Sequence, residues 1–201
     1  MGDYNITYDK AAPLKAKVVD KYKVVKELIP DYFGSDDVIG LDIKKFPRTG
    51  YTTKPEILVI CGSSRCLIIQ LSLIGLDSIF GAYTSTSNSS LEKFLTNSDI
   101  CFVRPFNFNL SKSQSVAVCE LAARVLKKPK LMKESSLEVV ARQVGVPYKD
   151  VYGSSVRDSK DGSIMVNDDD GVVLTQEQVE KVAYDAFTCR TIASKLLSSL
   201  K

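Results

Sequence analysis

Three apolar segments between residues 38 and 71 constrain the fold of this 201-residue chain more than any other feature. Ile57–Cys61 and Cys66–Leu71 are separated by only four residues, Gly62-Ser63-Ser64-Arg65, a spacing that suits an antiparallel hairpin. The preceding segment, Val38–Lys44, is apolar and carries charge on one face. Because side chains in a strand alternate between its two faces, these segments predict the centre of a β-sheet.

Helical patterns surround this predicted sheet. Apolar residues recur at three- and four-residue steps over Lys15–Leu28, and two segments, Ser135–Glu138 and Thr175–Gln178, have the capping-box pattern of a helix start. The other predicted elements are strand Tyr4–Tyr8, a loop over Tyr83–Ser90, helix Leu91–Leu95, strand Ile100–Phe108, helix Val118–Leu126, helix Val139–Val144 and a long last helix. Without an internal repeat or a long linker, the pattern predicts one α/β domain over residues 1–201.

The chain contains no histidine, which excludes Ser-His-Asp and Cys-His catalysis and every zinc site that needs histidine. Its net charge is +3 (27 basic minus 24 acidic residues), too small to indicate a polyanion partner by itself. Five cysteines without a secretion signal predict reduced thiols and an intracellular protein, in cytoplasm or nucleus, with no membrane association. Cys61 and Cys66 flank the hairpin loop, and we interpret them as reduced structural thiols rather than a disulfide.

Two groups of residues resemble one known family. Gly40-Leu41-Asp42, followed by Arg65-Cys66-Leu67-Ile68-Ile69-Gln70-Leu71, and the closing stretch from Leu174-Thr175 to Asp185-Ala186-Phe187 are similar to the ribonuclease D and Werner-type 3′–5′ exonucleases, especially the short single-domain plant members. The resemblance implies a ribonuclease H-like (DnaQ-like) three-layer fold, in which helices flank a five-stranded mixed sheet.

In this family, four carboxylates hold two divalent ions, Mg²⁺ or Mn²⁺, that activate a water and stabilise the leaving 3′ oxygen. The resemblance places Asp42 and Asp185 at the first and last of these positions, so both are the expected metal ligands if a metal is bound at all. The family's Asp-x-Glu motif has Lys44 in place of the glutamate. Period-two alternation puts Lys44 on the same strand face as Asp42.

Two further family positions are also substituted. The third aspartate aligns with Leu110, or with Asn109 or Asn107 if the register slips, and the water-positioning Tyr or His aligns with Lys181. Tyr184 is adjacent to Asp185 and is therefore turned about 100° away on a helix. The resemblance thus implies that the family's catalysis is disabled. Our hypothesis is that Lys44 and Lys181 neutralise the carboxylates in place of metal, so that no cofactor is expected.

Basic residues indicate where nucleic acid would bind. One run contains Arg124, Lys127, Lys128, Lys130 and Lys133, and a second, diluted by Asp20, lies within residues 10–26. A solvated lysine face is the alternative interpretation of both runs. We predict a protein that binds a single-stranded 3′ end or a partner, including a homologous subunit in a homo- or hetero-oligomer. The rivals are an active exonuclease that uses Asp42, Asp185 and either Glu120 or the aspartates at 168–170, and an interaction protein that binds no nucleic acid.

Overall fold

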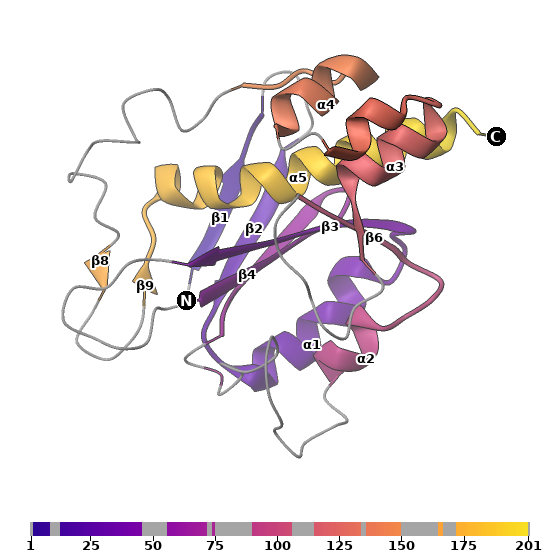
Figure 1. Cartoon of the computed structure of the whole chain (residues 1–201). Coiled ribbons are helices and arrows are strands. Elements are labelled where there is room, and N and C mark those ends of the chain that lie inside the picture. Colours follow the sequence, from indigo (N-terminus) through magenta and orange to yellow (C-terminus); the bar gives the residue numbers. More distant parts are fainter. Residues whose placement is uncertain are drawn as a thin grey trace.

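The fold is a mixed β-sheet between two layers of helices (Figure 1). The computed structural model describes residues 2–8, 13–45, 56–71, 74, 90–105, 115–133, 136–149, 165–166 and 172–200. Its first half contains β1 (Gly2–Ile6), β2 (Leu14–Val19), α1 (Tyr22–Phe33), β3 (Val38–Lys45), β4 (Glu56–Cys61), β5 (Arg65–Gln70) and α2 (Ser90–Leu95). Its second half contains β6 (Cys101–Arg104), β7 (Val116–Ala117), α3 (Val118–Val125), the 3₁₀ helix η1 (Pro129–Lys133), α4 (Leu137–Val144), β8 (Met165–Val166), β9 (Val172–Val173) and α5 (Gln176–Ser198).

The main sheet has seven strands in the order β1-β2-β5-β4-β3-β6-β7, and β8 and β9 form a separate pair. The β3–β4 and β4–β5 pairs are antiparallel, as the predicted hairpin requires, whereas β2–β5, β3–β6 and β6–β7 are parallel. The predicted mixed α/β sandwich is confirmed. The sheet has seven strands instead of the predicted five, because two of its strands were not predicted: β2, which lies between β1 and β5, and the two-residue β7, which pairs with β6 at the other edge.

The prediction of one helix over Lys15–Leu28 is also wrong. Leu14, Ala16 and Val18 are buried at every second position, and this segment is strand β2, paired with β5. Helix α1 begins only at Tyr22 and continues through Pro30 to Phe33. Only two residues separate the end of β2 from the start of α1. The apolar spacing therefore ran across both elements and was interpreted as one helix.

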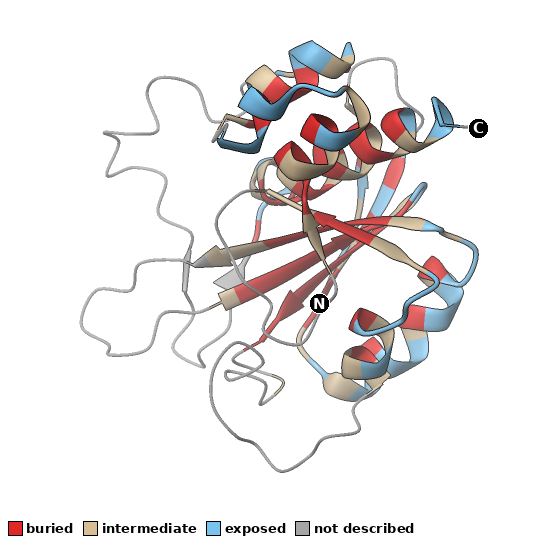
Figure 2. Cartoon of the chain, turned by 45° about the vertical axis from the view of Figure 1, so that its right-hand side comes forward, coloured by how far each residue is buried: buried red, intermediate tan, exposed pale blue. Residues whose placement is uncertain are grey.

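The core lies on both faces of the sheet (Figure 2). On one face, α5 packs against residues of β1, β2, β4 and β5, and on the other face α1 and α2 cover β3, β5 and β6. Helices α3 and α4 pack with α5 in a third cluster beside β6 and β7. Helix α5 therefore contributes to two of the three core clusters, and its position determines what lies over that face of the sheet.

The two predicted helix starts differ. At α5, Thr175 and Gln178 form the complete capping box. At α4, the cap is Ser136, which accepts from the Val139 amide, so Glu138 is one position too early for a capping box and instead pairs with Arg142. Within the ranges that the structure describes, every helix is too short or too polar to cross a lipid bilayer.

Candidate functional site

Strand β3 and helix α5 approach each other closely at Gly40. A Cβ atom at this position would lie 1.8 Å from the carbonyl oxygen of Ala186 and 3.1 Å from the Cβ of Arg190. Only glycine permits that approach, because the obstructing oxygen belongs to the helix backbone. The contact fixes Asp185, the neighbour of Ala186, over the strand that carries Asp42 two residues beyond Gly40.

The Lys44 ammonium lies between the carboxylates of Asp42 and Asp185. Lys44 Nζ is 2.7 Å from Asp42 Oδ2 and donates a hydrogen bond to Asp185 Oδ2 at 2.6 Å. The second carboxylate oxygen of Asp42 accepts from the Ile43 amide at 2.8 Å. The side chain of Asp42 is only 6% exposed, compared with 16% for Asp185 and 23% for Lys44. The three charged groups therefore form one partly buried cluster between β3 and α5.

Burial has the largest effect on the protonation of Asp42. It raises the pKa of Asp42 to about 6, even though the Lys44 charge acts to lower that pKa. Cys189, which is buried one helical turn after Asp185, has a pKa raised well above its usual value, first by burial and then by the charges of Asp42 and Asp185. The Cys189 thiol is therefore not an activated nucleophile, since activation of a thiol requires a lowered pKa.

The residues of this cluster do not fit the two divalent ions of the ribonuclease D-like mechanism. The ammonium of Lys44 already lies where a cation shared by Asp42 and Asp185 would bind. A divalent ion about 4 Å from that ammonium would be repelled by about 8 kcal/mol at an effective dielectric of about 20. Among the described residues, no group of three or more acidic or cysteine side chains could hold a metal ion. We therefore derive no metal-dependent step at this site.

The other predicted site residues lie elsewhere. Lys181 bonds Glu177 Oε1 at 2.7 Å, one turn earlier on α5. The hydroxyl of Tyr184 accepts from the Lys149 amide, and its ring packs among aromatic side chains away from the cluster. Glu120 lies in the first turn of α3. The predictions for Leu110, Asn107, Asn109 and Asp168–Asp170 lie outside the described residues.

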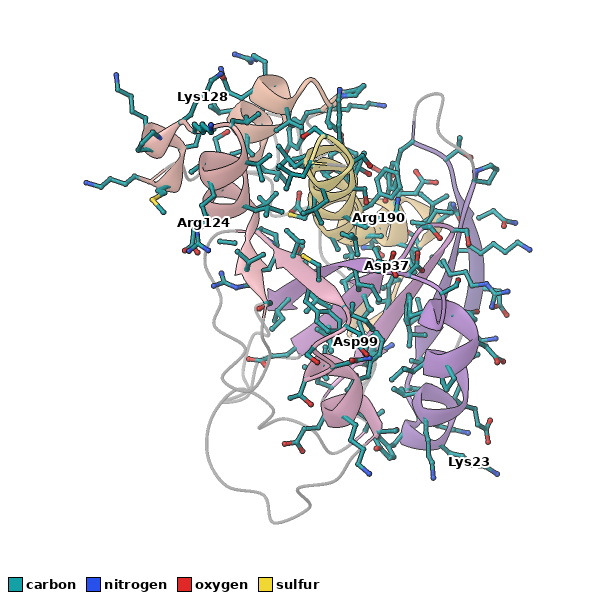
Figure 3. All side chains as sticks on the ribbon, turned by 90° about the vertical axis from the view of Figure 1, so that its right-hand side faces the viewer. Lys23, Asp37, Asp99, Arg124, Lys128 and Arg190 are labelled. Carbon is teal, nitrogen blue, oxygen red and sulfur yellow. The ribbon has the colours of Figure 1, made fainter. Side chains whose placement is uncertain are left out.

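The predicted nucleic-acid-binding lysines lie at the end of α3 and in η1. Arg124, Lys127, Lys128 and Lys130 are exposed, and Lys128 donates to Gln143 at 2.7 Å. Figure 3 shows Arg124 and Lys128 at one end of the molecule and Lys23, on α1, at the opposite end. Lys127 has a φ of 54°. This left-handed conformation is one that glycine adopts with less strain than lysine.

Two features of the site were missed by sequence reasoning. The first is the close approach at Gly40, whose signal is a glycine within an otherwise apolar strand. The second is the position of Cys61, which pairs with Gly40 in the β3–β4 ladder. Its Sγ atom lies 3.8 Å from the carbonyl oxygen of Ala183 in α5. The sequence indicated that Cys61 faces Cys66, but it gave no sign that α5 covers the pair.

Comparison with known proteins identifies the fold. No protein-family model and no curated protein sequence matches the chain. Three similar solved structures are the catalytic core of RRP6 from Trypanosoma brucei (10% identity, TM-score 0.59), Escherichia coli RNase D, an exoribonuclease involved in structured RNA processing (14%, 0.58), and the EXO domain of Aedes aegypti Nibbler (14%, 0.58).

The alignments cover 98%, 91% and 98% of this chain and 49%, 44% and 94% of those chains, in the same order. The chain thus spans about half the length of the RRP6 and RNase D structures and nearly all of the Nibbler domain. At these identities the likeness concerns the fold alone. The chain has the ribonuclease H-like fold of the DEDD 3′–5′ exonuclease domains.

Proposed function

We propose that residues 1–201 form a single 3′–5′ exonuclease-like domain that binds a single-stranded nucleic acid 3′ end and whose metal-dependent hydrolysis is lost or much reduced. The observation that carries the proposal is the contact of the Lys44 ammonium with both Asp42 and Asp185. One positive charge then neutralises, in part, the two carboxylates that this fold uses for metal. The fold shared with an exoribonuclease supports nucleic acid as the ligand class.

A nuclease assay tests the loss of hydrolysis. Single-stranded RNA and DNA labelled at the 5′ end are incubated with the protein in Mg²⁺, Mn²⁺ or EDTA. The Asp42→Ala/Asp185→Ala variant serves as the control for contaminating nuclease. We expect equal, background shortening for both proteins. Metal-dependent shortening from the 3′ end that the double variant lacks would refute the proposal and support the rival, an active exonuclease.

The Lys44→Glu variant tests the reason for the loss. It restores the Asp-x-Glu pattern and places three carboxylates around the position that the ammonium now occupies. We expect millimolar Mn²⁺ to raise the melting temperature of Lys44→Glu and to leave that of the wild type unchanged. The matched control is Lys44→Met, which removes the ammonium without adding a ligand. A clear Mn²⁺-induced rise for the wild type, abolished by Asp42→Ala, would show that the ammonium does not exclude metal.

Fluorescence anisotropy with labelled single-stranded RNA and DNA tests binding. Lys127→Gly removes a charge at a position whose left-handed backbone glycine adopts with less strain. Lys128→Gln removes a neighbouring charge. The matched control is Lys23→Gln, an exposed lysine on α1 at the opposite end of the molecule. If the α3–η1 lysines contact phosphates, each of the first two variants lowers the slope of log affinity against log salt by about 0.7, and the control does not. Equal effects of all three substitutions would show that nucleic acid is attracted by the overall positive charge and not by a site on α3 and η1.

A strand that ends in a 3′-phosphate tests recognition of the free 3′ end. If the protein recognises the 3′-hydroxyl, it should bind the 3′-phosphate strand more weakly than the 3′-hydroxyl strand. Equal affinities would limit the proposal to binding along the strand. Association with a related subunit stays a prediction, and light scattering on the purified chain tests its homo-oligomeric form.

A further inference from the structure

The β4–β5 hairpin brings two cysteine side chains together. Cys61 and Cys66 are paired in the antiparallel register, and their sulfur atoms are 2.6 Å apart. This separation is close to the S–S bond length of about 2.05 Å. Both residues carry free thiols, and neither side chain is exposed to solvent.

The hydrogen bonds of the hairpin show which type of pair this is. Gly62 donates to the Arg65 carbonyl at 2.9 Å next to the turn, and Leu71 donates to the Glu56 carbonyl at the other end of the ladder. Since hydrogen-bonded and non-hydrogen-bonded pairs alternate, the cysteines form a non-hydrogen-bonded pair, in which the Cα atoms approach to about 4.5 Å. That distance lies within the range of about 4.4–6.8 Å seen in disulfides.

We propose that Cys61 and Cys66 are a dithiol site that two-electron oxidation converts into an intramolecular, cross-strand disulfide. With hydrogen peroxide, one thiolate attacks a peroxide oxygen, the O–O bond breaks, and a sulfenic acid and one water form. The second thiol then attacks the sulfenic sulfur and releases a second water. The two cysteines lose two hydrogens in total, and the peroxide is reduced to two waters.

The surroundings determine the rate and the consequence. Burial raises the pKa of the Cys61 thiol well above its usual value, so the reactive thiolate is scarce and oxidation is slow. The nearest exposed residues on the hairpin are Ser63 and Ser64, in the turn between the two cysteines. The disulfide would remove the weak S–H contact between Cys61 and the Ala183 carbonyl and would fix the hairpin beneath α5. We therefore expect the oxidised protein to melt at a higher temperature than the reduced one.

The test is oxidation of the folded, full-length chain by hydrogen peroxide over several hours. The reaction is stopped with catalase, and the protein is unfolded and alkylated with N-ethylmaleimide. The reduced protein carries five adducts, because the chain has five cysteines. We expect three adducts after oxidation (5 − 2 = 3). Because trypsin cleaves after Arg65, between the two cysteines, the disulfide appears as two linked peptides.

The variants make the outcome specific. Cys66→Ser should form no disulfide and should lose at most one thiol, that of Cys61, which would stop at the sulfenic acid, whereas Cys101→Ser, a cysteine outside the pair, should still lose two. Retention of all five thiols by the folded wild type, or a linkage that joins any other pair of cysteines, would overturn the proposal. Formation of the disulfide only in unfolded protein would also overturn it, because the native hairpin would then not promote the reaction.

Discussion

Replacement of Lys44 by methionine tests the central cluster most directly. Methionine retains a long apolar side chain but leaves Asp42 and Asp185 without the ammonium that lies 2.7 Å and 2.6 Å from their oxygens. Removal of one partner from a buried ion pair generally costs about 3–5 kcal/mol, because the other charge stays buried and unpaired. Asp42 can avoid part of that cost by taking up a proton, because a neutral carboxyl group needs no charged partner.

The pKa of Asp42 determines which effect prevails. That pKa is about 6 with Lys44 present, and loss of the ammonium raises it further. Once Asp42 is protonated in the folded variant, the additional loss in free energy of unfolding reaches a limit of RT ln(1 + 10^(pH − pKa)). For Asp42 this limit is about 0.1 kcal/mol at pH 5, about 1.4 kcal/mol at pH 7 and about 2.7 kcal/mol at pH 8. Proton uptake therefore makes the cost small in acid and larger in base.

Urea unfolding followed by circular dichroism at pH 5, 7 and 8 measures this dependence. The difference between wild type and Lys44→Met should be near zero at pH 5 and should increase at each higher pH. Lys181→Met is the matched control, because Lys181 pairs with the exposed Glu177 and its loss should not change stability beyond experimental error. A difference of similar size at all three pH values would show that Lys44 acts through packing and would refute the electrostatic argument.

Three other variants follow from the same structure. The raised pKa of Asp42 lowers the free energy of unfolding of the wild type by about 3 kcal/mol as pH rises from about 4 to about 6. Asp42→Asn should remove this pH dependence, which urea titrations across that pH window measure. Gly40→Ala should lower the free energy of unfolding by more than about 2 kcal/mol, or prevent folding, since its Cβ would overlap the Ala186 carbonyl. Thermal melting checks this, and a near-neutral effect would contradict the close approach. Lys127→Gly should raise stability by about 0.5–1 kcal/mol by relieving the left-handed backbone, whereas a loss of stability would show that the lysine side chain is needed.

Much of the fold could be predicted because its central strands bury nearly every side chain. Residues Ile57 to Cys61 are all fully buried, so the apolar run in the sequence was a direct sign of a core strand. Strand β2 was missed because Leu14–Val19 precedes a true helix, and local apolar spacing does not separate the two elements. Strand β7 has only two residues, too few for any periodicity, and it forms only because β6 lies beside it.

The site was predictable in part. Alternation along the strand places Lys44 beside Asp42, but the contact with Asp185 depends on the crossing of α5 over Gly40, which no local pattern contains. The hypothesis had also assigned Lys181 to Asp185. Lys181 has a carboxylate four residues away on each side, and it pairs with Glu177. A glutamate N-terminal to the lysine is the more favourable order on a helix, which is a sufficient reason for that choice.

The charge of the cluster separates the two parts of the proposed function. Asp42 and Asp185 with one ammonium carry a net charge of −1 when both carboxylates are ionised, so this cluster repels a phosphate backbone. Any affinity for nucleic acid must therefore come from basic residues elsewhere, and the exposed lysines of the α3–η1 segment meet that need. On this reasoning, substitutions of Asp42 or Asp185 leave binding intact or strengthen it. Substitutions of Lys127 and Lys128 weaken binding without changing the cluster, because the two groups lie on different elements of the fold.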